Sequence, residues 1–191
     1  MSVMNEELNF IYDEAEEHMK KTIAHLEHEL KSIRAGKASP QMLATVVVDY
    51  YGSPTPLSQV ANVGVRDAQT LTIQPWEKNM LSVIERAIIN ANLGFAPNNN
   101  GEMIIINIPP LTEERRKELV KQAKEEAEIA KVSIRNIRKD ANNDIKKLEK
   151  NKEISEDESK SAHDKIQKLT DKYIDEVEKH LDKKEKDIMT V

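Results

Sequence analysis

The histidines near the N-terminus are the first side chains whose type and spacing could support chemistry. His18, His25 and His28 fall in a segment with helical periodicity, and the last two could share a helix face. His28-Glu29 does not complete the zinc-protease helix motif, because Ser32 stands where the second histidine is required. A zinc ion would also need three or four convergent ligands. Solvated helix positions are therefore the favoured interpretation, and an enzyme using this face is an alternative that metal analysis would test.

Other catalytic signatures are missing from the sequence. The chain has 0 cysteines, which excludes disulfides and thiolate zinc sites and is typical of a reducing cytoplasm. It contains neither a phosphate-binding glycine loop nor a Gly-x-Ser-x-Gly elbow. We therefore expect no enzyme, no metal and no cofactor.

The pattern that favours a function is a basic strip, defined as Lys131, Arg135, Arg138, Lys139, Asn142 and Lys146. Except for Lys139, which is adjacent, its members recur at helical steps of three and four residues. The opposite flank of the same apolar seam carries three acidic residues, Glu126, Asp140 and Asp144, together with Ser133. Arginines spaced one turn apart can follow a phosphate backbone, so the strip predicts an RNA contact made by shape. A solvated face with ion pairs such as Glu128 to Lys131 is the alternative.

Composition limits where RNA can bind. The formal net charge is −5, so an RNA site has to be a local patch.

No apolar run approaches the roughly 20 residues that cross a bilayer. Met1 to Phe10 carries Glu6 and Glu7 without a basic region, which argues against a signal peptide.

Three long helices must position the strip. Segments 5–34, 112–150 and 155–191 are charged and carry apolar residues at steps of three and four, typical of helices packed in an antiparallel bundle. Ser155 and Glu158 form a predicted capping box at the third helix, and Thr112 is a predicted N-cap for the second.

The middle of the chain differs in character. It predicts strands at 45–51, 71–73 and 103–108, a helix at 79–92, and turns at 52–54 and 98–101. The fold class is therefore α+β: a discontinuous bundle, residues 1–35 and 110–191, with an inserted β/α/β domain, residues 36–109. We expect Trp76 and Phe95 in the core of the insert.

Two short crossings join the predicted domains, and this arrangement is typical of a hinge. The hinge residues are Arg34, Gly36, Lys37, Pro109 and Pro110. Arg34 lies in the last turn of a helix, where a cation is favourable and a structural role is expected.

At this point the sequence resembles the ribosome recycling factor family over essentially its whole length. The resemblance is carried, in the family's order and spacing, by residues 34–40 (RAGKASP), 51–57 (YGSPTPL), 109–116 (PPLTEERR), 135–142 (RNIRKDAN) and 152–157 (KEISED). Two positions depart mildly: Lys37 and Lys139 stand where many members have arginine, which keeps the charge and loses bidentate geometry.

The resemblance implies an L-shaped, transfer-RNA-like molecule that acts as a cytoplasmic monomer. It implies that the bundle binds the large ribosomal subunit, with Arg135 and Arg138 on ribosomal RNA, and that the small domain swings about the hinge and engages elongation factor G. That factor hydrolyses GTP, and members of the family have no reaction of their own. The competing interpretation is a helical scaffold that binds partner helices through exposed apolar positions.

Overall fold

The computed structural model describes residues 6–190. The mixture of long helices and short strands confirms the α+β class. The described chain forms two compact units: the residues up to Arg34 together with Glu113–Thr190, and the residues Ala35–Thr112. The first five residues of the predicted bundle, and Val191, lie outside the described residues.

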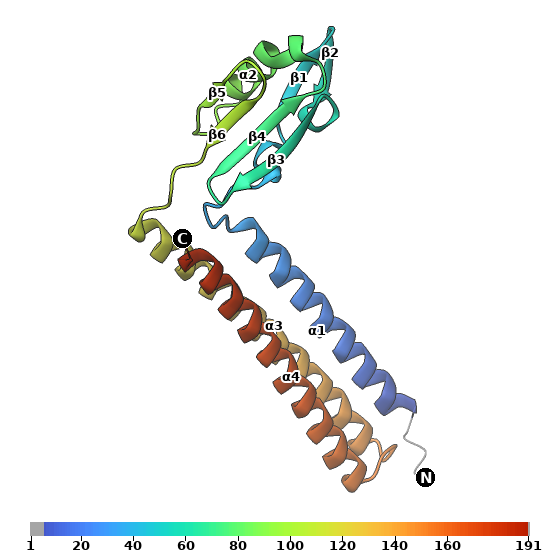
Figure 1. Ribbon diagram of the computed structural model, residues 1–191. Helices are drawn as coiled ribbons and strands as arrows, with labels where there is room; N and C mark the ends of the chain where they lie inside the picture. Colours follow the sequence, from blue (N-terminus) through green and yellow to red (C-terminus); the bar gives the residue numbers. More distant parts are fainter. Residues whose placement is uncertain (1–5, 191) are drawn as a thin grey trace. The chain divides into compact units, whose positions relative to one another are not determined.

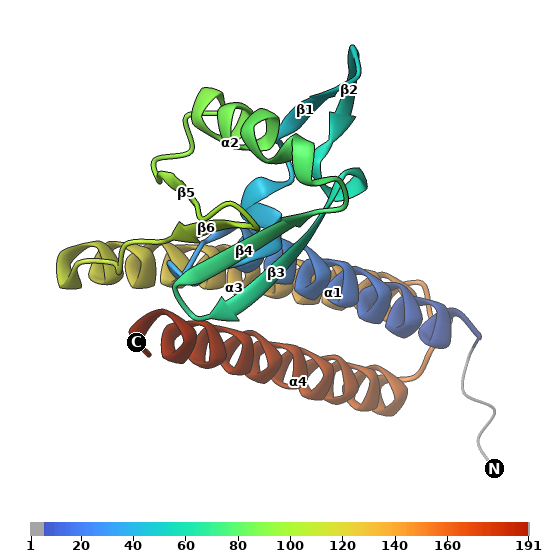
Figure 2. The same cartoon turned by 45° about the horizontal axis from the view of Figure 1, so that its top comes forward.

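The first unit is a bundle of three long helices, which lie side by side in Figures 1 and 2. They are α1 (Glu6–Ser32, 27 residues), α3 (Glu113–Lys150, 38 residues) and α4 (Glu156–Met189, 34 residues). Helices α1 and α4 run in one direction and α3 in the other. At 1.5 Å per residue α3 is about 57 Å long, so the bundle is a rod that can carry a row of side chains along one edge.

The predicted apolar stripes form the bundle core. Met19, Ile134 and Ile166 bring one buried side chain from each helix, and Ala123 and Ala127 give α3 a narrow surface on which its neighbours can approach closely. Tyr173 of α4 is buried, and its hydroxyl donates to the Glu16 carboxylate on α1 across 3.3 Å. Burial, with Glu16 close by, raises the pKa of Tyr173 to about 12.

The turn between α3 and α4 follows the predicted chemistry. The Ser155 hydroxyl accepts from the Glu158 amide at 3.3 Å, and the Ser155 amide donates to the Glu158 carboxylate at 2.8 Å, which confirms the capping box. The Ser155 amide, and after it the Ser155 hydroxyl, which donates to the same carboxylate at 2.9 Å, hold the pKa of Glu158 below its ordinary value. Lys152 reverses the chain with a φ of 62°.

The second unit contains two antiparallel sheets and one helix. Strands β1 (Val47–Tyr50) and β2 (Ser53–Pro56) form a ribbon, and a four-stranded sheet has the order β3-β4-β6-β5. The bounds of the latter are Ala61–Asp67 for β3, Thr70–Pro75 for β4, Pro97–Asn99 for β5 and Ile104–Asn107 for β6. Helix α2 (Leu81–Asn90) contacts β1 and β5. Three short 3-10 turns complete the unit: Pro40–Leu43, Leu57–Gln59 and Lys78–Met80.

The insert contains six strands, so the expectation of three was wrong. The missed strands are β2, β3 and β5, and each owes its strand geometry to a neighbour. Strand β3 contains Gly64 and Asp67, which have low strand propensity, and a bulge at Arg66, and it is held by pairing along β4. Strand β2 has two prolines, which are tolerated at the edge of a ribbon. Asn98 and Asn99, predicted as a turn, belong to β5.

The predicted core position of Trp76 was also wrong. Its side chain is 69% exposed, whereas Phe95 packs against the core as a partly buried residue. Trp76 directly follows the end of β4, where only its amide is anchored, donating to the Val60 carbonyl at 3.1 Å. The strand alternation that buries Leu71 and Ile73 does not extend to it.

Candidate nucleic-acid interface

The basic strip lies along the side of α3 that meets α4. Three of its members reach across that seam: Lys131 pairs with Glu178, Arg138 donates to Gln167, and Asn142 meets His163. The long α3–α4 contact therefore has polar side chains along its edge, outside the apolar core.

Lys131 and Asn142 are the members most engaged in holding the bundle together. The Lys131 side chain is only 18% exposed, with its ammonium on the Glu178 carboxylate. The Asn142 amide oxygen is 2.8 Å from Nδ1 of His163, and Asn142 is half-buried. Both side chains thus have protein partners that a phosphate would have to displace.

Arg135 and Arg138 keep charge available toward solvent. Arg135 pairs with Glu128 at 2.9 Å, but both side chains are about half exposed, and exposed pairs contribute roughly 0–1 kcal/mol. Arg138 donates from Nη1 to the neutral amide oxygen of Gln167 at 3.1 Å, so its charge is not compensated by that bond. Gln167 in turn donates to Asp171 at 2.8 Å, which fixes the amide that orients Arg138.

Lys139 and Lys146 are exposed, and within residues 6–190 neither forms an ion pair or a side-chain hydrogen bond. Together with Arg135 and Arg138 they form a cationic row over three turns of one helix. Such a row can contact phosphates spaced along a backbone. The alternative predicted pair of Glu128 with Lys131 is replaced by Glu128 with Arg135 and Lys131 with Glu178.

The α4 residues that orient the strip escaped the sequence interpretation. Glu178, Gln167 and His163 are ordinary polar positions in α4, and only the register between two helices identifies them as partners of the strip. No periodicity within either helix encodes that register.

The acidic flank of α3 faces α1. Ser133 and Thr22 share a hydrogen bond of 3.3 Å across this seam, and farther along a pocket opens between the two helices.

Ile129 and Val132 of α3 are exposed. They form a pair and not a continuous apolar stripe of the kind that a helical scaffold would present.

The predicted hinge residues lie where the chain passes from one unit to the other. The expectation that Arg34 lies in the last turn of a helix was wrong, because α1 ends two residues earlier, at Ser32. Gly36 has a φ of +71°, and a Cβ added there would lie 2.5 Å from Cγ of Leu111, so the two crossings touch. The amides of Ala38 and Ile108 donate to the adjacent carbonyls of Ala68 and Gln69, both at 2.7 Å. Lys37 is half-buried, whereas Arg34, Pro109 and Pro110 are exposed.

The predicted histidine face shows no metal-binding geometry. His25 lies 3.9 Å from Glu29, and His28 is exposed. Among residues 6–190, no group of three or more His, Cys, Asp or Glu side chains is arranged to hold a metal ion. Across the same range, no helix is both long and apolar enough to span a membrane.

Sequence comparisons agree over nearly the whole chain. A family model described as ribosome recycling factor matches residues 26–189. The ribosome-recycling factor of Flavobacterium psychrophilum is 62% identical over 188 residues, 98% of this chain and 100% of the relative. That of Legionella pneumophila strain Paris is 53% identical over 184 residues, 96% and 100% of the two chains.

Structure comparisons give the same family. A solution structure of ribosome recycling factor is similar with a TM-score of 0.69 and 42% identity, covering 97% of this chain and 98% of that one. A second similar structure is a T. thermophilus ribosome recycling factor, described together with E. coli elongation factor G bound to the E. coli post-termination complex. Its TM-score is 0.59 and its identity 45%, and the match covers 96% and 99% of the two chains.

Proposed function

Because this chain belongs to the ribosome recycling factor family, we propose that it binds the large ribosomal subunit of the post-termination complex. With elongation factor G and GTP, it promotes splitting of the ribosome and release from messenger RNA for a new round of translation. Support for these partners comes from the related T. thermophilus factor, whose structure is described together with elongation factor G bound to such a complex. The chain acts in the cytoplasm as a monomer and carries out no reaction of its own.

The observation that carries the binding proposal is the cationic row on α3, in which Arg138 is half-buried and the other members are exposed. Arg135, Arg138, Lys139 and Lys146 follow one edge of a rigid helix, which can place them against successive phosphates of ribosomal RNA. Lys131 and Asn142 contribute indirectly, because their bonds to Glu178 and His163 fix α4 against the row. Contacts of this kind depend on backbone shape and leave base sequence unread.

The second part of the proposal concerns the crossings at Gly36 and Pro109-Pro110. Backbone hydrogen bonds from Ala38 and Ile108 tie each crossing to the turn between β3 and β4, so rotation is confined to the few residues between these anchors and the bundle helices. We propose that these residues, including Arg34 and Lys37, are the pivot about which elongation factor G displaces the small domain.

A disulfide across the crossings tests the pivot. The natural chain has no cysteine, so Gly36→Cys with Leu111→Cys places one bond where the crossings touch. The oxidised protein should bind large subunits as tightly as wild type and split post-termination ribosomes at least several-fold more slowly in a light-scattering assay. Reduction of the same sample should restore the rate, which controls for the strain of cysteine at position 36. Equal rates for both forms would contradict the pivot.

The binding and splitting proposals are tested with Arg135→Ala/Arg138→Ala in the same assay. Loss of two phosphate contacts should lower both subunit affinity and the splitting rate at limiting concentration. Near-normal splitting at saturating concentration would show that the row serves binding alone, whereas unchanged affinity would contradict its role.

A further inference from the structure

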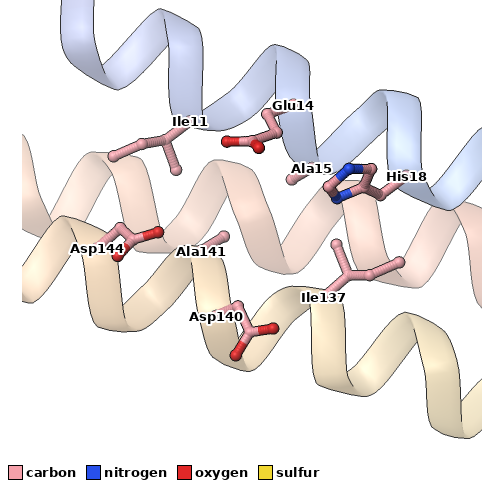
Figure 3. Close-up of a pocket in the computed structure, with 8 residues that line it drawn as sticks. All are labelled: Ile11, Glu14, Ala15, His18, Ile137, Asp140, Ala141 and Asp144. Atoms are coloured by element: carbon pink, nitrogen blue, oxygen red, sulfur yellow. The ribbon is translucent and has the colours of Figure 1, made fainter.

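A groove on the acidic side of α3 is not used by the proposed RNA contact. It lies between α1 and α3, has a volume of about 200 Å³, and is shown in Figure 3. Helix α1 contributes Ile11, Glu14, Ala15 and His18, and α3 contributes Ile137, Asp140, Ala141 and Asp144. All eight belong to the bundle unit.

The groove exists because the helices meet here through small side chains. Ala15 and Ala141 are both buried and form its floor, at positions where larger residues such as Met19 and Ile145 fill the seam on either side. Two methyl groups leave a hollow between helices that bulkier residues keep in contact elsewhere. Ile11 and Ile137 are half-buried and complete an apolar surface.

The rim of the groove is negative. Glu14 and Asp140 are exposed, and with the other described residues neither forms an ion pair or a side-chain hydrogen bond. Asp144 is paired with Lys147 at 2.8 Å, and Asp144, with a smaller contribution from Asp140, holds the pKa of Lys147 above its ordinary value. By contrast, Glu16 and Glu17 of the same helix each pair with a lysine one turn away, and Glu16 also pairs with Lys172 of α4.

An apolar floor under a carboxylate rim defines the chemistry of an occupant. Methylene groups lie favourably on Ala and Ile side chains, and a cationic head is attracted to Glu14 and Asp140 at the surface. The volume is below the roughly 300–1,000 Å³ of small-molecule sites, so the hollow suits one side chain. Arginine fits better than lysine, because its planar guanidinium can donate to carboxylates from two helices at once.

RNA is excluded as the occupant by the same charges, since phosphates are repelled by an acidic rim. We propose that the groove between α1 and α3 is a protein-docking site that receives one arginine side chain from a basic segment of a partner protein. In the ribosome-bound state, which rests on the proposed function, this site would give the bundle a protein contact on one flank and an RNA contact on the other.

The direct test is a methyl NMR titration of the full-length protein with the peptide acetyl-Gly-Arg-Gly-amide. The methyls of Ile11 and Ile137 should shift saturably and those of Ile166, in the bundle core, should not. The double variant Glu14→Gln/Asp140→Asn should bind at least tenfold more weakly. Asp13→Asn is the matched control, because it removes a neighbouring exposed charge that does not line the groove, and should bind as wild type does.

Three results of the titration would overturn the proposal. They are no shift at Ile11 and Ile137, equal shifts from the isosteric neutral citrulline peptide, or equal affinity in the double variant. Tighter binding of spermidine than of the peptide would also overturn it, because the occupant would then be a free polycation.

Binding to isolated large ribosomal subunits gives a second test, in which the direction of the change in affinity decides. Removing two negative charges should strengthen binding to a polyanion if the groove is unoccupied. An arginine docked in the groove predicts the opposite, a several-fold weaker binding of Glu14→Gln/Asp140→Asn with Asp13→Asn unchanged. Stronger binding of the double variant would contradict the docking site on the ribosome. Failure of wild type to bind would refute the proposed function instead, and the peptide titration would still decide the groove.

Discussion

The two flanks of α3 carry opposite charge and use it differently. On the α4 side, basic residues are tied to or oriented by α4 side chains, as Lys131 is by Glu178 and Arg138 by Gln167. On the α1 side, Glu14 and Asp140 stand over a hollow without such partners among the described residues. A helix between two neighbours thus offers two surfaces, and a net charge of −5 describes neither of them.

The difference in charge between the two flanks shows how one helical bundle can bind two kinds of partner. A cationic row held rigid by a neighbouring helix is suited to phosphates, whose spacing is regular. An apolar hollow with an acidic rim is suited to one cationic side chain. Both surfaces depend on the buried seam between them, so the largest expected effect comes from breaking that seam.

Ile134→Ala should disrupt both flanks together. Ile134 is fully buried at the centre of α3, and truncation of such a residue costs about 2–5 kcal/mol in the free energy of unfolding. Urea unfolding of the full chain followed by far-UV circular dichroism measures this loss. Val132→Ala, at a position 45% exposed, is the control and should change stability by less than about 0.5 kcal/mol. Similar losses in the two variants would mean that the seam is not the core.

Tyr173→Phe should remove an alkaline sensitivity that belongs to the contact between α4 and α1. The folded pKa of Tyr173, about 12, exceeds its ordinary 10.0, so its contribution to stability is complete below pH 10 and is lost as the pH rises toward 12. The linked loss approaches roughly 2–3 kcal/mol across that window. The unfolding free energy of wild type should therefore fall by this amount relative to that of the variant between pH 10 and 12. Parallel curves would show that the raised pKa is absent.

The basic strip itself should separate into structural and free cations. Lys131→Met removes a partly buried partner of Glu178 and should lower stability by about 1 kcal/mol. Lys139→Met removes an exposed cation without a partner in the described chain and should change it by less than about 0.5 kcal/mol. In subunit binding the order should reverse, with Lys139→Met the weaker binder. Thermal melts give the stabilities of the two variants, and binding isotherms of the same samples give their affinities for the subunit. Equal stabilities and equal affinities would contradict the division into structural and free cations.

The helices and the strip could be predicted because their determinants are local. Steps of three and four residues place Met19, Ile134 and Ile166 in the core, and Ser155 with Glu158 marks the start of α4. Strands such as β3 could not be found in this way, since Gly64 and Asp67 take strand geometry from β4 and not from their own propensity. The exposure of Trp76 likewise depends on where the chain leaves β4.

For the site, the sequence indicated which face of α3 is cationic but not which cations are free. That Lys131 is held by Glu178 while Lys139 is exposed depends on the register of α4, which no pattern within α3 contains. The groove could not be predicted either, because it depends on the register between α1 and α3. Ala15 and Ala141 form a hollow only when the two helices bring them together.

The most direct test of the account is binding to isolated large ribosomal subunits over a salt series, for wild type, Arg138→Ala and Lys147→Ala. Lys147 lies on the acidic flank of the same helix and is paired with Asp144, so it is a matched control. Wild-type affinity should fall linearly with log salt, and Arg138→Ala should bind more weakly with a slope smaller by about one phosphate contact. Lys147→Ala should keep the wild-type slope. A wild-type affinity that does not depend on salt, or an equal change in both variants, would contradict an RNA contact by the basic strip.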